Sequence, residues 1–202
     1  MFQITPAPAQ PSTTSPPPPT LHTPPQIALV ISCYPNIFTK PTQLPLPRNI
    51  QHHIHLLPNT DPINVKPYRY PHFQKMEIEK QITSMLAVGL IQPSHSPFSS
   101  PILLVKKDET WRCCVDYRAL NAIIVKDRFP MPTIDELLDD LGQASWFLKL
   151  DLRQGFHQIL MAEADIYKTA FQTHEGHYEF KVMPFGLCNA PSTFQAAMND
   201  AL

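Results

Sequence analysis

Apolar and polar positions alternate most regularly in Trp146–Ile159, where every second position at the centre is a leucine: Leu148, Leu150 and Leu152. A period of two is that of a β-strand with one apolar face. Asp151 lies near the end of this predicted strand, and Gly155 then allows a turn that presents Phe156 close to the carboxylate. We expect the strand to pair with a second one at His177–Val182.

The period changes to that of a helix over Pro71–Leu90, where apolar residues recur every four positions: Ile78, Ile82, Leu86 and Leu90. Gly89 and then Pro93 are residue types at which helices commonly end. A second helix is predicted from the capping box Thr133-Ile134-Asp135-Glu136, and it should continue through Leu141.

Two β-hairpins are predicted from apolar runs separated by turn residues. The first joins Ile102–Lys107 to Trp111–Tyr117 through the turn Asp108-Glu109-Thr110. The second joins Thr169–Thr173 to His177–Val182. Both require only short connections, as antiparallel pairs do.

The remaining segments are less regular. Gln51–Leu57 is predicted to be an edge strand, Ala162–Lys168 a short helix, and Ile27–Phe38 a short strand or turn. Gly186 permits a tight turn. Asn189 is placed to cap a final helix, whose buried stripe would contain four residues: Phe194, Ala197, Met198 and Ala201.

Proline is concentrated near the N-terminus, since 13 of the 24 prolines precede Arg48. Residues 1–40 are interpreted as a Pro-rich linker that is mostly disordered. Its composition suits a polyproline II ligand for an SH3- or WW-type domain, although a simple spacer is the favoured interpretation. The 202-residue chain has a net charge of -1, so any nucleic-acid binding must depend on local sites.

The cysteines and histidines give little sign of a metal site. The four cysteines form no CxxC pair and no signal peptide precedes them, which predicts free thiols in an intracellular protein of the cytoplasm or nucleus that is not secreted. No apolar run reaches the ~18 residues that span a bilayer, so no membrane partner is expected. His52, His53 and His55 permit a zinc hypothesis, but neighbouring strand residues face opposite ways. The HEGH sequence at 174–177 lacks the HExxH spacing and is interpreted as a hairpin tip.

Several long motifs, in consistent order and spacing, resemble the reverse transcriptases of gypsy-type LTR retrotransposons. The string LKLDLRQGFHQI, followed by DIYKTAFQTHEGHYEFKVMPFGLCNAPSTFQAAMN, is similar to the palm of those enzymes. Upstream, HFQKMEIEKQITSMLAVGLIQPSHSPFSSPILLVKK and WRCCVDYRALNAIIVKDRFPMPTIDELLDDL are similar to the fingers and the fingers–palm junction. The resemblance covers residues 41–202. It implies an α+β fold with fingers and a partial, ferredoxin-like split palm, cut from a longer polyprotein.

The resemblance implies an RNA-directed DNA polymerase that adds dNTPs to a primer by two-metal phosphoryl transfer with Mg²⁺. Asp151 matches a catalytic, metal-binding aspartate of the family, with Leu152 beside it at the metal site. Lys107 and Arg112 match residues that hold the nucleotide triphosphate, and both side chains can neutralise phosphate oxygens. The hairpin tip reads KKDET and has no glycine, unlike the longer tip of the family. We therefore expect a reshaped tip, in which the residue that matches the family's lysine is Lys107 or its neighbour.

Further roles transfer to single positions by resemblance. Phe156 matches the bulky side chain that rejects a ribose 2′-hydroxyl, and Phe185 and Gly186 match residues of the nucleotide pocket. Asn189 matches a position on the template path. The expected partners are therefore an RNA or DNA template-primer and a dNTP.

The second acidic motif of the family, a Tyr/Phe-x-Asp-Asp turn, is not found within the 202 residues. With one carboxylate of three, two divalent ions would lack most of their protein ligands, so we expect the chain to be inactive alone. Two alternatives stay open. One is a non-catalytic binding remnant whose Pro-rich tail recruits a partner, and the other is a small zinc protein built on the histidines.

Overall fold

The computed structural model describes six stretches of the chain: residues 25–34, 41–107, 110–130, 133–142, 152 and 154–201. The chain divides into two compact units, Met1–Thr39 and Lys40–Leu202. Residues 1–24, on which the SH3 or WW hypothesis depends, lie outside the described residues.

In the first unit the described residues form a helix, α1 (Pro25–Cys33), so the prediction of a strand or turn there is wrong. Pro25 suits the first turn of a helix, where no partner is needed for the N–H that it lacks. In the last turn the Ser32 hydroxyl donates to the Leu29 carbonyl at 2.6 Å. These local effects outweigh the strand preference of the β-branched residues in this segment.

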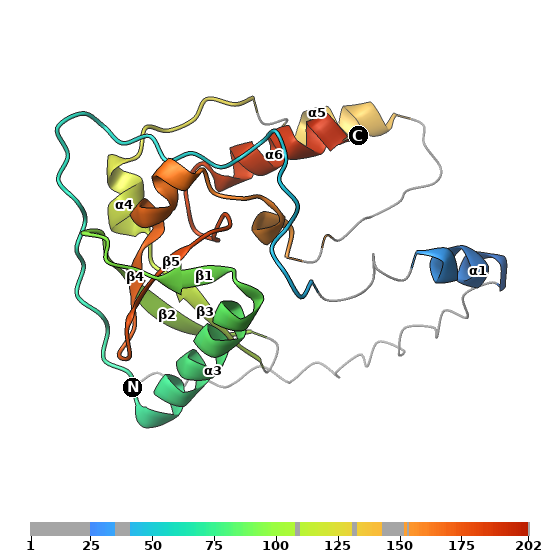
Figure 1. The fold of residues 1–202 in the computed structure, drawn as a ribbon. Coiled ribbons are helices and arrows are strands. Elements are labelled where there is room, and N and C mark those ends of the chain that lie inside the picture. Colours follow the sequence, from blue (N-terminus) through green and yellow to red (C-terminus); the bar gives the residue numbers. More distant parts are fainter. Residues whose placement is uncertain are drawn as a thin grey trace, which may run out of the picture. The chain divides into compact units, whose positions relative to one another are not determined.

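The second unit is built on a five-stranded sheet with the strand order β1-β5-β4-β2-β3 (Figure 1). Its strands are short: β1 (Ile91–Pro93), β2 (Ser100–Lys107), β3 (Thr110–Val115), β4 (Phe171–Gln172) and β5 (His177–Phe180). Neighbouring strands are antiparallel except β2 and β4, which run parallel with Ser100 opposite Phe171. The parallel pair therefore joins two hairpins that are far apart in the sequence.

Both predicted hairpins are confirmed. In the first, Lys107 pairs with Thr110, which leaves a tip of two residues, 108 and 109, that lie outside the described residues. In the second, Gln172 pairs with His177 across a four-residue turn. The fold is thus α+β, with the sheet made of local hairpins plus one long-range pairing.

The predicted helix at 71–90 is confirmed as α3 (His72–Val88), which packs against the sheet (Figure 1). Ile78 and Ile82 are buried in a cluster that includes Phe171 of β4. The helix ends at Gly89, whose φ of 79° lies in the left-handed region that glycine adopts without a Cβ clash.

A second core lies among two 3₁₀ turns and two helices: η1 (Gly155–Gln158), η2 (Glu163–Thr169), α4 (Arg118–Ile123) and α6 (Ala190–Ala201). Tyr117 is fully buried there, and its hydroxyl donates to the Thr169 carbonyl at 2.7 Å. η2 confirms the short helix predicted at 162–168, in the tighter 3₁₀ form. The α6 stripe is confirmed for Phe194, Ala197 and Met198, whereas Ala201 is exposed.

The predicted capping box begins α5 (Ile134–Leu141). The Thr133 hydroxyl accepts from the Glu136 amide at 3.2 Å, and the Glu136 carboxylate accepts from the Thr133 amide at 2.7 Å. Among the described residues, the helices are too short or too polar to cross a membrane.

The segment 41–65, which we call the strap, is extended but does not form the edge strand predicted at Gln51–Leu57. It forms three isolated bridges instead, each to a different element: His52 with Met161, Leu56 with Ile124, and Asn64 with Ser99. The strand prediction is wrong because the strap changes partner before a continuous ladder can form.

Both edges of β5 are occupied, since Tyr178 pairs with β1 on one side and with β4 on the other. Beyond β5, Val182 pairs with Leu160. Asp151, and residues 143–150 before it, lie outside the described residues, so the expected pairing of the Asp151 strand with His177–Val182 stays a prediction.

Candidate nucleotide-binding surface

Two aromatic side chains predicted to face the nucleotide lie together at the surface of the second core. The rings of Phe156 and Phe185 are stacked, with centroids 4.9 Å apart and planes 20° apart. Phe194 of α6 packs behind Phe156 at 5.3 Å. Phe185 is 52% exposed, whereas Phe156 and Phe194 are partly buried against the second core. We call these three residues the aromatic cluster.

Gly155 allows Phe156 to sit against α6. A Cβ at position 155 would lie 2.9 Å from Cε2 of Phe194, which is closer than side chains approach one another. The residue before it, Gln154, has a φ of 53°, so the chain turns sharply on entering η1. Gly155 was predicted to form the turn itself, and the structure shows that the glycine is needed for the close approach to Phe194.

The turn that carries Phe185 is held from the other side. Gly186 has a φ of 96°, and a Cβ there would lie 3.3 Å from the Val115 carbonyl oxygen at the end of β3. Asn121 of α4 donates to the Gly186 carbonyl at 2.8 Å and accepts from the Cys188 amide at 2.9 Å. Sequence reasoning missed Asn121, although it lies in the DYRALN string that carried part of the family resemblance.

Asn189 does not cap α6 with its side chain, so that prediction is wrong. The backbone carbonyl of Asn189 accepts from the Thr193 amide, as the first carbonyl of the helix. The side chain instead holds the segment after α4, donating to the Val125 carbonyl at 2.9 Å and accepting from the Asp127 amide at 3.1 Å. The Asn189 side-chain amide thus forms hydrogen bonds to a segment distant in sequence and does not cap the first turn of α6.

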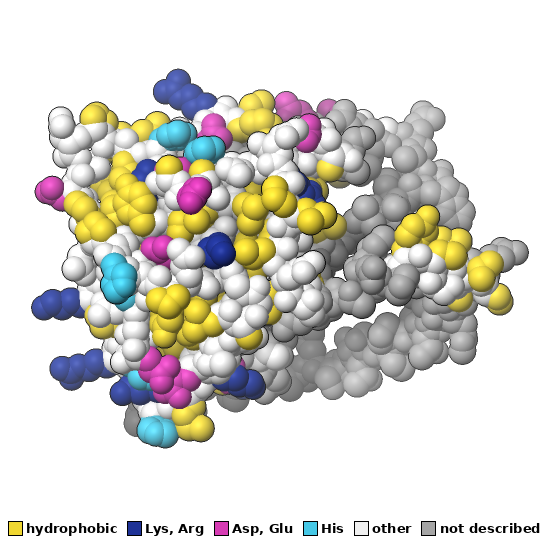
Figure 2. All heavy atoms as spheres, in the orientation of Figure 1, with side chains coloured by type: hydrophobic (Ala, Val, Ile, Leu, Met, Phe, Trp, Pro, Cys, Tyr) yellow, Lys and Arg dark blue, Asp and Glu magenta, His cyan; other side chains and the backbone are white. Residues whose placement is uncertain are grey.

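A groove of about 370 Å³ lies beside Asn189. Lys126 and Arg128 line it, together with His53 and His55 of the strap. The two imidazole rings are stacked, with centroids 5.8 Å apart. We call this the Asn189 groove. Its lining holds two basic side chains and one acidic one, Asp127. Figure 2 shows Lys and Arg interspersed with Asp and Glu over the visible face.

His157 packs against the aromatic cluster. Its ring contacts Phe185 edge-on at 5.3 Å and Phe180 at 6.1 Å. Nδ1 is buried and has no hydrogen-bond partner among the described residues. Burial lowers the pKa of His157 to about 4, because the charged imidazolium would be poorly solvated there. The ring is therefore neutral at pH 7.

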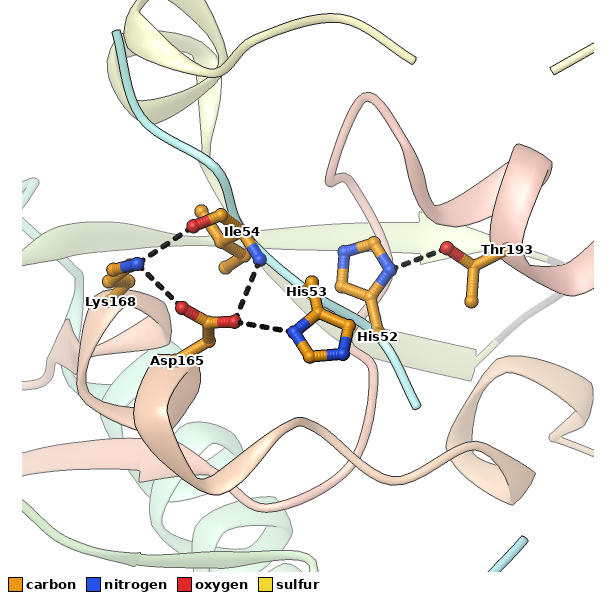
Figure 3. A network of polar contacts seen from close by, with 6 residues as sticks. All are labelled: His52, His53, Ile54, Asp165, Lys168 and Thr193. Atoms are coloured by element: carbon orange, nitrogen blue, oxygen red, sulfur yellow. Dashed lines mark hydrogen bonds and ion pairs between the residues drawn. The ribbon is translucent and has the colours of Figure 1, made fainter. Parts of the chain in front are cut away.

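The strap histidines face different partners, as Figure 3 shows. The His52 ring points to Thr193, with Nδ1 2.8 Å from the hydroxyl, whereas His53 Nδ1 lies 3.2 Å from the Asp165 carboxylate. Lys168 donates to the same carboxylate at 2.5 Å. Burial opposes ionisation of Asp165, but the bonds from Lys168 and the Ile54 amide hold its pKa below the usual range. These contacts attach the strap to η2 and α6.

A second polar cluster at the end of β3 was also missed. Arg118 donates two hydrogen bonds to Asp116, from Nε at 2.9 Å and from a terminal nitrogen at 2.6 Å. The Tyr68 hydroxyl donates to the same carboxylate at 2.9 Å. The Arg118 bonds hold the pKa of Asp116 below its usual range. The only signal in the sequence was an acidic residue two positions before an arginine.

The predicted phosphate and metal ligands are described only in part. Arg112 is exposed on β3, opposite Val105, and forms no ion pair with the described residues. It precedes Val115 by three residues, which is roughly 10 Å along the strand from the Gly186 turn. The side chain of Lys107 and all of Asp151 lie outside the described residues, and Leu152 is 48% exposed. The structure thus places Phe156 beside Phe185 and Gly186, whereas the predicted metal ligand Asp151 lies outside the described residues.

Residues 104–202 match the family described as "Reverse transcriptase (RNA-dependent DNA polymerase)". The chain is 44% identical over 166 residues to the retrovirus-related Pol polyprotein from transposon 297 of Drosophila melanogaster. It is 43% identical over 132 residues to the corresponding polyprotein from transposon gypsy of the same species. These matches cover 79% and 62% of this chain but only 16% and 13% of the polyproteins.

The fold is similar to that of the foamy viral protease-reverse transcriptase in complex with an RNA/DNA hybrid, with a TM-score of 0.71 and 23% sequence identity. The match covers 87% of this chain and 24% of that protein. At this identity the likeness shows the fold, which agrees with the α+β fingers and partial palm expected from the motifs.

Proposed function

Because this chain belongs to the reverse transcriptase family through residues 104–202, we propose that it provides the fingers and part of the palm of an RNA-directed DNA polymerase. Such an enzyme adds deoxynucleotides to a primer paired with a template. The observation that supports this most directly is the stack of Phe156 on Phe185 at 4.9 Å. Two positions separated in sequence, each matched to the nucleotide pocket by motif, meet in one exposed surface.

Phe156 would act as the side chain that rejects ribonucleotides. Its ring packs against the rings of both Phe185 and Phe194. A ring packed against two others has little room to move away from an additional hydroxyl, so a ribose would clash where a deoxyribose fits. Phe185, which is half exposed, would contact the nucleotide directly.

Arg112 would bind the triphosphate. Its guanidinium is solvent-exposed and has no carboxylate partner among the described residues. A planar fork of N–H donors binds phosphate oxygens in pairs, which suits this position near the hairpin tip. Lys107 would add a second positive charge from the opposite strand.

Asp151 and Leu152 would hold Mg²⁺ at the end of their segment, by motif match. When bound, Mg²⁺ supplies Lewis-acid activation of the primer hydroxyl and neutralises phosphate charge. An aspartate oxygen is the hard ligand that Mg²⁺ prefers, so the donor type fits. The matched motifs provide one carboxylate within the 202 residues, and we expect no primer extension from the chain by itself.

The test is to place residues 41–202 in the transposon 297 polyprotein, replacing the matched segment, and to measure primer extension on an RNA template. We expect activity in the chimera. Asp151→Asn should remove nearly all of it, because the amide keeps the shape but loses the charge. Asp61→Asn, at an exposed carboxylate, is the matched control and should be silent.

Substrate selection provides an independent readout in the same chimera. Phe156→Val should raise incorporation of ribonucleotides by on the order of tenfold or more while deoxynucleotide incorporation continues. An active chimera that tolerates Asp151→Asn would refute the role of Asp151. An inactive chimera whose 202-residue parent still binds an RNA/DNA hybrid would favour the binding-remnant alternative.

A further inference from the structure

The tip of the β4–β5 hairpin meets α3 through three side chains that can bind a metal ion. His174 Nε2 lies 2.7 Å from Glu79 Oε1, although the two residues are 95 positions apart in the chain. Glu175 follows His174 at the same tip. One ligand atom from each of the three residues lies within 4.8 Å of the other two.

The backbone around these side chains is held firmly on both sides. At the tip, the Thr173 hydroxyl accepts from the amides of Glu175 and Gly176, each at 3.1 Å. The Thr173 amide donates to the Gly176 carbonyl at 2.9 Å, which closes the turn. On the helix, Glu79 adjoins Ile78, which is buried against the sheet. The three positions therefore converge without further folding of the chain.

The charge of the cluster favours a cation. Two carboxylates and one imidazole carry a net negative charge when the imidazole is neutral. No described Lys or Arg forms an ion pair with Glu79 or Glu175, and Glu175 has no side-chain hydrogen bond among the described residues. A divalent ion between the three groups would relieve the repulsion between the carboxylates.

We propose that Glu79, His174 and Glu175 form a binding site for a divalent transition-metal ion, with Zn²⁺ as the best match. Zn²⁺ binds imidazole nitrogen and carboxylate oxygen at about 2.0–2.2 Å, so ligand atoms within 4.8 Å of each other need only small side-chain rotations to reach one ion. Imidazole selects Zn²⁺ over Mg²⁺ and Ca²⁺, which prefer oxygen alone. Three protein ligands leave the fourth position to water.

The site would fasten the hairpin tip to α3. The HEGH spacing gave no metal motif, and the placement of His174 at a hairpin tip is confirmed. The third ligand, Glu79, lies on α3, 95 positions from His174 in the chain. A short sequence motif therefore could not reveal it. An ion bound only in the folded state stabilises that state, in proportion to the logarithm of its concentration over its dissociation constant.

Zn²⁺ binding to the full 202-residue chain tests the proposal by calorimetry and thermal unfolding. We expect one tight equivalent of Zn²⁺ and a rise in Tm that Mg²⁺ does not reproduce. His174→Gln and Glu79→Gln should each weaken this binding by about tenfold or more, since even outer-shell changes at metal sites have effects of that size. His95→Gln, at an exposed histidine that forms no side-chain hydrogen bond or ion pair with the described residues, should bind as the parent does.

Two further measurements distinguish metal binding at this site from binding to other thiol or imidazole groups of the chain. Co²⁺ bound at the site should show no thiolate charge-transfer band, because none of the three ligands is a cysteine. Glu175→Gln changes a side chain without described bonds, so its fold is secure, and it should also weaken binding. Wild-type affinity in His174→Gln or Glu175→Gln, or a thiolate band, would overturn the proposal.

Discussion

At the scale of single residues, the buried His52 and the half-buried His157 stay neutral at pH 7 and make the stability of the fold depend on pH. His52 is 1% exposed, and burial lowers its pKa to about 4, with His53 adding repulsion. His157 shows the same shift from burial alone. They differ in bonding, because His52 has Thr193 as a partner while Nδ1 of His157 has none among the described residues.

Their titration predicts a loss of stability in mild acid. The folded-state pKa of each is about 4, below the ordinary 6.5, so the unfolded chain binds protons first as the pH falls. Stability is complete above pH 6.5 and is lost progressively down to pH 4, by about 2 kcal/mol per histidine at pH 5. Urea unfolding at pH 7 and pH 5 measures this difference.

The variant His157→Phe should flatten that pH dependence by about half. It removes the unpartnered Nδ1 and keeps an aromatic ring beside Phe185, so at pH 7 the free energy of unfolding should stay within about 1 kcal/mol of the parent or increase. His95→Gln, at an exposed site, serves as the control. An unchanged pH slope in His157→Phe would show that His157 is not the titrating group.

At the scale of elements, the end of α3 depends on one backbone conformation. Gly89 has a φ of 79°, and a Cβ there would lie 3.8 Å from Leu44 Cγ, an ordinary contact. Gly89→Ala should therefore destabilise the fold by about 1 kcal/mol through backbone strain alone. Gly89→Asn should cost less, because asparagine tolerates this region. Equal effects of Ala and Asn in chemical denaturation would contradict this cause.

Elements specified by neighbouring residues were predictable from the sequence. The apolar spacing of Ile78 and Ile82 and the glycine at 89 located α3, and the Thr133–Glu136 capping box located α5. Each depends on interactions within a few positions, which a linear pattern displays. The hairpin at 102–117 was predictable for the same reason.

Elements whose partners are distant were not predictable. Asn189 was assigned to a local cap, but its amide bonds to the backbone of Val125 and Asp127. Gln51–Leu57 has a strand-like pattern, but the strap finds a new partner at each bridge. Within the aromatic cluster, motif matching indicated Phe156 and Phe185, whereas their stacking and the support from Asn121 required the three-dimensional structure.

At the scale of the whole molecule, a net charge of -1 limits nonspecific attraction to nucleic acid. Binding of an RNA/DNA hybrid should therefore depend on the Asn189 groove. Lys126→Ala and Arg128→Ala should each reduce the slope of log affinity against log salt by about 1, as expected for one phosphate contact. Lys80→Ala, at an exposed lysine of α3, should leave the slope unchanged. Equal slopes in all three variants would exclude the groove as the phosphate contact.

The strap determines the order in which this unit can be completed during synthesis. His52 and Ile54 leave the ribosome early, but the partner of His52, Met161, is made about a hundred residues later, roughly 5–20 s at ordinary rates of translation. Ile54 is 1% exposed in the finished fold and would be open to water throughout that delay. The strap is therefore made early but can pack against Met161 only late in synthesis. Until then the nascent chain exposes an apolar segment that chaperones can recognise.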